Sequence, residues 1–220
     1  MLTTLLLAAL LNSGNPAQGN PDLKTPYEKG NGNQTTTYEE AIEWYRTLDK
    51  AYEEVKMMPY GYTDSGRLLH LVVVSTDQDF EPASAKKKNK RVVLIQNGIH
   101  PGEPEGIDAT MMLVRDYLQD KNKRKQLDNV VLAVIPVYNI DGALNRNSHT
   151  RTNQNGPEEY GFRGNARNLD LNRDYIKTDS RNAELFHLIF RDWDPDVFVD
   201  NHTSNGADYQ HVMTLIATQH

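Results

Sequence analysis

Cysteine is absent from this 220-residue sequence. The absence excludes disulfide bonds and thiolate metal ligands, so any bound metal must be held by His, Asp or Glu side chains. Clustered positive charge is lacking as well, because the formal net charge is -6 and the one lysine run, at 86–90, is expected to form a solvated loop between two strands. Proteins that bind nucleic acids by neutralising phosphates need such clusters, so nucleic acid is not an expected partner.

Long hydrophobic runs are also lacking, and no segment has the ~20 apolar residues that cross a bilayer, so no membrane span is expected. The apolar run from Leu5 to Leu11 is followed by small and polar residues. This pattern suits a secretory signal peptide over residues 1–19, with cleavage near Ala17. The basic residues that usually precede such a run are missing, so a buried core helix and a misassigned start are the alternatives. The expected location is outside the cytoplasm, either periplasmic or secreted.

The rest of the chain divides into a linker and one domain. Residues 20–36 are rich in Gly, Asn, Pro and Thr and are expected to form a linker that contributes no core. Thr37 followed by Glu40 makes a capping box, and apolar residues then recur at helical spacing, which predicts a helix from about Tyr38 to Val55. Residues 37–220 suit a single domain, because domains typically run ~100–200 residues.

Continuous apolar runs, typical of strands covered on both faces, alternate with helical patterns in this domain. The expected strands are 67–75, 91–98, 130–139 and 196–202, with 208–218 as a further candidate. The helical patterns occupy 105–118 and 179–192. This alternation predicts an α/β fold with a mixed, mostly parallel sheet and helices on both faces.

A histidine and a glutamate lie three residues apart just after one of these strands, in the turn His100-Pro101-Gly102-Glu103. Ligands of open α/β sheets bind at the carboxyl ends of the strands. A Pro-Gly turn is tight enough for both side chains to chelate one divalent ion. Alone the pair is a weak signal, and a helix-capping turn with acidic residues near a helix N-terminus is the simpler alternative.

A second histidine, His202, ends another expected strand in the equivalent position. Two histidines and one glutamate, with water in the fourth place, form a catalytic zinc arrangement. The alternative for His202 is a strand-end histidine that hydrogen-bonds a loop. We therefore expect one Zn2+ per chain, held by His100, Glu103 and His202.

In their order and spacing, the motifs resemble the zinc carboxypeptidase family of metallopeptidases. The resemblance covers nearly everything after the linker and rests on TYEEAIEWYRTL, GYTDSGRLLHLVVVS, HPGE, NIDG, DLNRDY and DNHTSNG. It implies a carboxypeptidase-like fold, and a zinc enzyme that removes C-terminal residues from peptides. It also implies that Asn172 and Arg173 hold the substrate's terminal carboxylate and that Arg151 polarises the scissile carbonyl. The implied partner is a peptide with a free C-terminal carboxylate.

The side chains suit these roles chemically. A planar guanidinium that is always charged can make two parallel hydrogen bonds to a carboxylate, which Arg173 can do and a lysine cannot. Asn172 adds a neutral donor. Arg151 lies in a long polar stretch, 143–169, and such stretches in compact domains are usually functional or disordered. The other arginines of that stretch are Arg146, Arg163 and Arg167. Each of the four can instead be a surface charge, and which one polarises the carbonyl stays open.

The chain departs from the family's pattern after His202. In these enzymes a general-base glutamate and a substrate-capping tyrosine follow the third zinc ligand at some distance, whereas no glutamate follows Glu184 here. We therefore expect an incomplete catalytic domain, its N-terminal part at 37–220. It should be inactive alone, because the general base is missing. It should also be poorly soluble, because the candidate strand 208–218 would leave an uncovered sheet edge. If the chain is active by itself, Glu105 is the expected base.

Two other functions remain open. A zinc-dependent acyl-amino-acid deacylase shares the H-x-x-E pair and the distant histidine, although the long N-terminal helix and the block from NIDG to DLNR favour the peptidase. A non-catalytic exported binding module with a retained or decayed site is the other alternative. A later glutamate and tyrosine would support an enzyme, and their absence would support a binding module.

Overall fold

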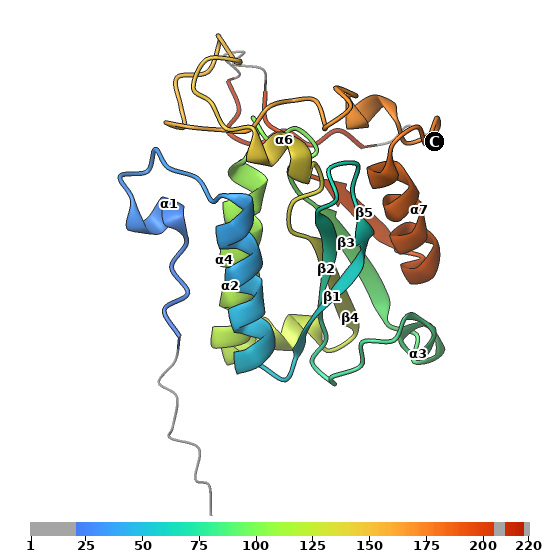
Figure 1. Cartoon of the computed structure of the whole chain (residues 1–220). Coiled ribbons are helices and arrows are strands. Elements are labelled where there is room, and N and C mark those ends of the chain that lie inside the picture. The colour runs from blue at the N-terminus through green and yellow to red at the C-terminus, as the bar shows by residue number, and fades with distance from the viewer. Residues whose placement is uncertain (1–20, 205–209, 218–220) are drawn as a thin grey trace, which may run out of the picture.

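A single five-stranded sheet with helices on both faces forms the centre of the protein (Figure 1). The computed structural model describes residues 21–204 and 210–217, so the expected signal peptide at 1–19 lies outside the described residues. The strands are β1 (Val55–Tyr62), β2 (Leu68–Val74), β3 (Arg91–Gln96), β4 (Val130–Ile135) and β5 (Val197–Asp200).

The sheet order is β1-β2-β4-β3-β5. β3 pairs in parallel with both β4 and β5, whereas β2 runs antiparallel to β1 and to β4. Every strand except β2 therefore points the same way, which confirms the prediction of a mixed, mostly parallel sheet. It also brings the carboxyl ends of β3 and β5 to the same edge.

Two layers of helices enclose the sheet, with α2 and α4 on one face and α3 and α7 on the other (Figure 1). The helices are α1 (Pro26–Lys29), α2 (Tyr38–Ala51), α3 (Pro82–Lys87), α4 (Glu105–Gln119), α5 (Lys121–Arg124), α6 (Ile140–Leu144) and α7 (Arg181–Trp193). Short 3-10 turns occur at η1 (Lys125–Leu127) and η2 (Leu171–Arg173).

The helix α2 begins where its sequence predicts. The Thr37 hydroxyl accepts a hydrogen bond from the Glu40 backbone N–H, and the Glu40 carboxylate accepts one from Thr37 N–H, which completes the capping box. The helix ends at Ala51 and not at Val55, because Val55 opens the edge strand β1. That strand was not predicted. Pro59 interrupts its sequence, and its pairing with β2 shifts register there, as is common in edge strands.

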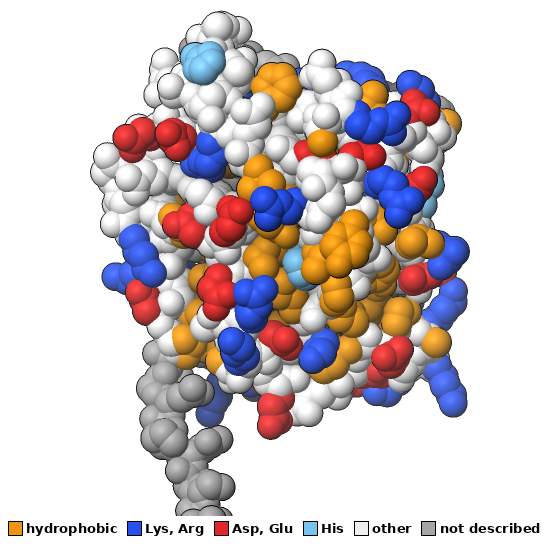
Figure 2. Space-filling view, in the orientation of Figure 1, with side chains coloured by type: hydrophobic (Ala, Val, Ile, Leu, Met, Phe, Trp, Pro, Cys, Tyr) orange, Lys and Arg blue, Asp and Glu red, His pale blue; other side chains and the backbone are white. Residues whose placement is uncertain are grey.

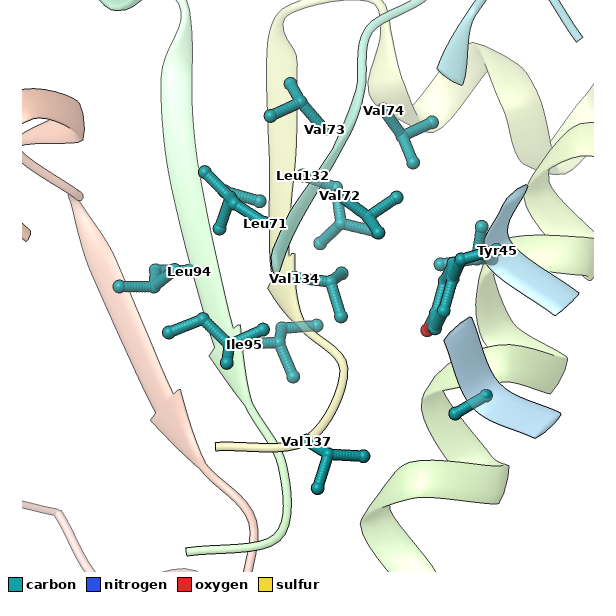
Figure 3. Close-up of a cluster of buried hydrophobic side chains, with 14 of the residues drawn as sticks. Tyr45, Leu71, Val72, Val73, Val74, Leu94, Ile95, Leu132, Val134 and Val137 are labelled. Carbon is teal, nitrogen blue, oxygen red and sulfur yellow. The ribbon is translucent and has the colours of Figure 1, made fainter. Parts of the chain in front are cut away.

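The main core lies between α2, α4 and the sheet. Figure 3 shows Tyr45 of α2 pointing toward the side chains of Val72 and Val134 on the central strands. All three are fully buried, which explains why the central strands have continuous apolar runs. Burial of this kind, at about 25 cal/mol per Å² of apolar surface, is the main source of stability that holds the strand ends in place.

The segment expected to be a linker is docked on the domain, and the expectation that it contributes no core is wrong. Leu23 is buried, and its carbonyl accepts a hydrogen bond from Trp44 Nε1 at 3.1 Å. Thr35 and Thr36 donate hydrogen bonds to the buried carboxylate of Asp108 on α4. The Gly/Asn/Pro content signalled turns correctly, but these turns pack through polar side chains onto α4.

The lysine run at 86–90 is not a simple solvated loop, because its first residues end α3 and Lys90 is buried against Asp77. On the face shown in Figure 2, Lys and Arg side chains are interspersed with Asp and Glu. Within the described residues, no helix is both long and apolar enough to cross a membrane.

The candidate strand at 208–218 is contradicted where it is described. Residues 210–217 adopt no regular secondary structure and are exposed. The exposed apolar side chains there are Val212, Met213, Leu215 and Ile216. The apolar residues of this stretch signalled a strand, but no described neighbour pairs with the segment. An uncovered strand at this position therefore no longer supports the expectation of poor solubility, which stays a prediction.

Candidate metal centre

The first two candidate ligands lie on a tight turn that leaves β3. Gly98 has φ +65°, a left-handed conformation that favours glycine, and its carbonyl accepts a hydrogen bond from Asn139 N–H, just beyond β4. Glu103 N–H then donates to the His100 carbonyl at 2.8 Å, which closes the turn. α4 begins at Glu105, so the turn is held between the end of β3 and the start of a helix.

The third candidate ligand comes from the neighbouring strand. β5 pairs with β3 so that Gln96 lies opposite Asp200, and Asn201 N–H continues the ladder by donating to Gln96 O at 3.0 Å. His202 therefore projects at the same edge as the turn. The candidate ligand atoms of His100, Glu103 and His202 all lie within 4.8 Å of one another. The structure thus brings together the three residues that the sequence predicts.

Both histidines direct the same ring nitrogen at Glu103. His100 Nδ1 lies 3.3 Å from Glu103 Oε1, and His202 Nδ1 lies 3.1 Å from Glu103 Oε2. The opposite nitrogens contact carboxylates: His100 Nε2 is 3.0 Å from Asp170 Oδ1, and His202 Nε2 is 2.9 Å from Asp200 Oδ2. A carboxylate on one ring nitrogen fixes the tautomer and turns the other nitrogen toward a metal.

The donor set fits a divalent metal such as zinc. His100 and Glu103 are 3% and 4% exposed, and buried polar atoms normally have hydrogen-bond partners. His100 Nδ1 is buried and makes no hydrogen bond despite its proximity to Glu103. A lone pair aimed into the cluster is suited to a metal ion. Two imidazole nitrogens and one carboxylate match the ligand types and the number that catalytic zinc sites use.

The charges within the cluster reinforce one another. Burial would raise the pKa of Glu103, but the neighbouring imidazoles of His100 and His202 and a hydrogen bond from the Thr203 backbone outweigh burial and lower that pKa. Hydrogen bonds to Asp200 and then Glu103 raise the pKa of His202 to about 9. Glu103 is therefore anionic at neutral pH. His202 must release a proton before its Nδ1 can bind a metal.

Two loop arginines approach Glu103, and only one of them was singled out from the sequence. Arg151 Nη2 donates to Glu103 Oε1 at 2.8 Å. Arg163 Nη1 lies 3.9 Å from the same oxygen, while its Nε and Nη2 contact Asp170 Oδ2 at 3.0 Å. The Arg163 side chain is 39% exposed against 11% for Arg151. Both line a small cavity of about 250 Å³ beside Phe162, so both could meet a substrate carbonyl.

The residues predicted to read a carboxylate lie next to this cluster on η2. Asp170 caps η2 by accepting from Asn172 N–H at 3.0 Å while it also contacts His100. Asn172 is therefore adjacent to the cluster. Arg173 is exposed and donates to the Asn172 carbonyl at 2.8 Å. Among the described contacts, none joins the Arg173 guanidinium to the three candidate ligands.

The zinc carboxypeptidase family model matches residues 41–208, a range that contains all three candidate ligands. The chain belongs to the zinc carboxypeptidase family. Solved carboxypeptidases share its fold. A metallo-carboxypeptidase of Burkholderia cenocepacia matches with a TM-score of 0.62 at 21% identity, over 80% of this chain and 43% of that chain. The carboxypeptidase A of Helicoverpa armigera matches with a TM-score of 0.61 at 18% identity, over 78% of this chain and 46% of that chain.

Curated relatives of this zinc carboxypeptidase family member include one named as an inactive metallocarboxypeptidase and others named as carboxypeptidases. An inactive metallocarboxypeptidase of Schizosaccharomyces pombe is 33% identical over 104 residues, which cover 45% of this chain and 21% of the relative. The carboxypeptidase 2 of Trichophyton tonsurans is 26% identical over 159 residues, which cover 72% of this chain and 24% of the relative. The chain therefore spans about a quarter of the length of the curated relatives that it matches.

Two carboxylates at the site of this family member were not recognised from the sequence. Asp170 and Asp200 each orient one histidine, although Asp170 lies 70 residues from His100 in the chain. Their local signal was available, because Asp170 opens DLNRDY and Asp200 precedes His202 by two residues. Glu105, the expected alternative base, begins α4 next to the turn, and the protein around its carboxyl raises its pKa by desolvation.

Proposed function

We propose that the protein is a zinc-dependent metallocarboxypeptidase that acts on peptides with a free C-terminal carboxylate. The observation that carries the proposal is that ligand atoms of His100, Glu103 and His202 lie within 4.8 Å of one another, with a carboxylate behind each imidazole ring. Membership of the zinc carboxypeptidase family supports the same chemistry. The expected signal peptide at 1–19 would place the activity outside the cytoplasm.

In this proposal, His100, Glu103 and His202 hold the metal. A zinc ion held by these residues would lower the pKa of a bound water toward ~7 and would polarise a carbonyl. Asp170 and Asp200 keep the two imidazoles in the tautomer that presents Nδ1. The buried position of Glu103 excludes bulk water from one side of the site, which strengthens electrostatic interactions there.

The arginines supply charge at fixed positions around this centre. Arg151 is proposed to stabilise the oxyanion that develops on the scissile carbonyl, because its guanidinium already lies 2.8 Å from Glu103. Arg163 is the second candidate, since it is more exposed and is anchored by Asp170. Arg173 and Asn172 are proposed to bind the terminal carboxylate through two parallel hydrogen bonds and a neutral donor.

A non-catalytic metal-binding module is the second candidate function. One curated relative bears the name of an inactive metallocarboxypeptidase. The described carboxylates closest to the cluster, Asp170 and Asp200, are each engaged by a histidine ring. Glu105 is the remaining described carboxylate beside the turn, and its replacement by glutamine tests whether it accepts the proton in catalysis. Deacylase activity remains a third outcome of the same assays.

The decisive experiment compares two peptides that differ only in having a free or an amidated C-terminus. The zinc-loaded protein should release the last residue from the free acid and turn over the amide poorly, because the Arg173 guanidinium would lose its charged partner. Arg173→Gln should raise KM for the free acid about 10- to 100-fold. Arg167→Gln is the matched control, since Arg167 is an exposed arginine six residues before Arg173 in the chain.

Equal turnover of free and amidated peptides would contradict carboxylate recognition and point to an endopeptidase. Cleavage of N-acyl amino acids in place of peptides would identify a deacylase. Zinc binding without turnover of any of these substrates would favour the non-catalytic module. Chelation followed by restoration of zinc separates metal-dependent turnover from contamination.

A further inference from the structure

The phenol of Tyr175 lies behind the carboxylate that orients His202. Tyr175 OH donates to Asp200 Oδ2 at 3.3 Å, and the same oxygen lies 2.9 Å from His202 Nε2. Gln96 Nε2 donates to Tyr175 OH at 2.6 Å and to Asp200 Oδ1 at 3.1 Å. The four side chains therefore form one hydrogen-bonded chain from β3 to the candidate metal ligand.

Each link of this chain restrains the next. Gln96 is fully buried on β3 and lies opposite Asp200 in the ladder, so its side chain has a fixed origin. Its amide donates to the phenol oxygen, which leaves the phenol hydrogen free to point at Asp200. Burial, together with the charge of Asp200, raises the pKa of Tyr175, so the phenol keeps its proton. With donors on both of its oxygens, Asp200 has little freedom to rotate away from His202.

We propose that Tyr175 is a positioning residue for His202, acting through Asp200. This inference rests on the proposed metal site. The phenol holds the Asp200 carboxylate against His202 Nε2, which keeps the imidazole turned so that Nδ1 faces Glu103. Groups behind a metal-binding histidine commonly change metal affinity or activity 10- to 100-fold when they are removed.

The segment from Asp170 to Tyr175 thereby restrains the orientation of both candidate metal-binding histidines. Asp170 at its start contacts His100 Nε2, and Tyr175 at its end restrains the partner of His202. Asn172 and Arg173, the proposed carboxylate readers, lie between them on η2. A shift of this segment would therefore change the orientation of both imidazoles together. It would also move the proposed carboxylate-binding residues with them.

The test uses Tyr175→Phe, which removes the hydroxyl and keeps the ring that packs on Phe186 at a centroid distance of 4.9 Å. Tyr138→Phe is the matched control. Tyr138 packs on the same phenylalanine at 5.9 Å, and its buried hydroxyl has no hydrogen-bond partner. The measurements are Co2+ affinity in competition with a chelator, the visible absorption spectrum of the Co2+-loaded protein, and the unfolding midpoint without metal.

Tyr175→Phe should weaken Co2+ binding about tenfold, at the lower end of the range for groups behind a histidine, and should change the Co2+ spectrum. Tyr138→Phe should match the unaltered protein in both. If Tyr175 acts through Asp200, adding Tyr175→Phe to Asp200→Asn should cost little more than Asp200→Asn alone. The inference would be overturned if Tyr175→Phe left the Co2+ affinity and spectrum unchanged. It would also be overturned if Tyr175→Phe still lowered Co2+ affinity tenfold in the Asp200→Asn background. Failure of the unaltered protein to bind Co2+ would overturn the metal site itself, and this inference with it.

Discussion

Replacing Asp108 by alanine should release the N-terminal segment, residues 21–36, from α4. The Asp108 carboxylate is 5% exposed and accepts three hydrogen bonds, from Thr35 Oγ1 at 2.8 Å, Thr36 N–H at 3.1 Å and Thr36 Oγ1 at 2.6 Å. Both threonines are themselves buried. These bonds hold the segment where Leu23 packs into the core.

The expected loss of stability follows from those three donors. A buried polar group left without a partner costs about 1–3 kcal/mol. The costs do not add fully, because the released segment can turn its threonines toward water, so the free energy of unfolding should fall by about 3 kcal/mol. For a protein of this size, that corresponds to a decrease in Tm of about 6–12 °C.

Urea unfolding and limited trypsin digestion measure the two effects. Trypsin should cut the Asp108→Ala variant after Lys24 or Lys29 much faster than the unaltered protein, because cleavage requires local release of the backbone. Asp116→Ala is the matched control: Asp116 lies on the same helix, but its ion pair with Lys123 is exposed, so its loss should change stability by less than about 1 kcal/mol. Equal stability and equal cleavage of the two variants would refute the reasoning, and the segment would then behave as the linker that its composition suggests.

Two further predictions concern the loop and the acid range. If Arg151 stabilises the oxyanion, Arg151→Ala should lower kcat about 10²- to 10³-fold in steady-state kinetics. A decrease of that size in Arg163→Ala alone would instead assign the role to Arg163. Burial would raise the pKa of Asp174, but hydrogen bonds from Ser180 and the backbone of Asp179 outweigh it and lower that pKa. Asp174 therefore stabilises the fold above its unfolded pKa of ~3.9, and this contribution is lost as pH falls below that value. The stability difference between the unaltered protein and Asp174→Asn, taken from urea midpoints, should shrink between pH 6 and pH 3, and a constant difference would contradict the assignment.

The central strands were predictable because burial on both faces leaves a mark in the sequence. β2, β3 and β4 have continuous apolar runs since helices cover both faces of the sheet. β1 was missed, because Pro59 and Gly61 are not typical strand residues. An edge strand tolerates them, since its outer side pairs with no other strand in the described sheet. The docking of residues 21–36 was missed for another reason. Its hydrogen bonds to Asp108 join residues more than 70 positions apart, which composition does not report.

The candidate ligands were predictable because strand ends that share an edge bring distant residues together. His100 and His202 follow the parallel neighbours β3 and β5, so their proximity follows from topology. The residues behind them were not predictable in the same way. Asp170 reaches His100 from an irregular loop, and no periodic pattern fixes where such a loop returns. The choice between Arg151 and Arg163 likewise depends on the course of that loop.

Metal analysis of the full chain after exhaustive dialysis tests the central claim most directly. The account predicts about one zinc per chain in the unaltered protein and in His149→Ala, since His149 is an exposed loop histidine outside the cluster. It predicts strong loss of zinc in His202→Ala, because removal of one of three protein ligands leaves an incomplete site. Retention of one zinc per chain by His202→Ala would contradict the claim that His100, Glu103 and His202 together hold the metal.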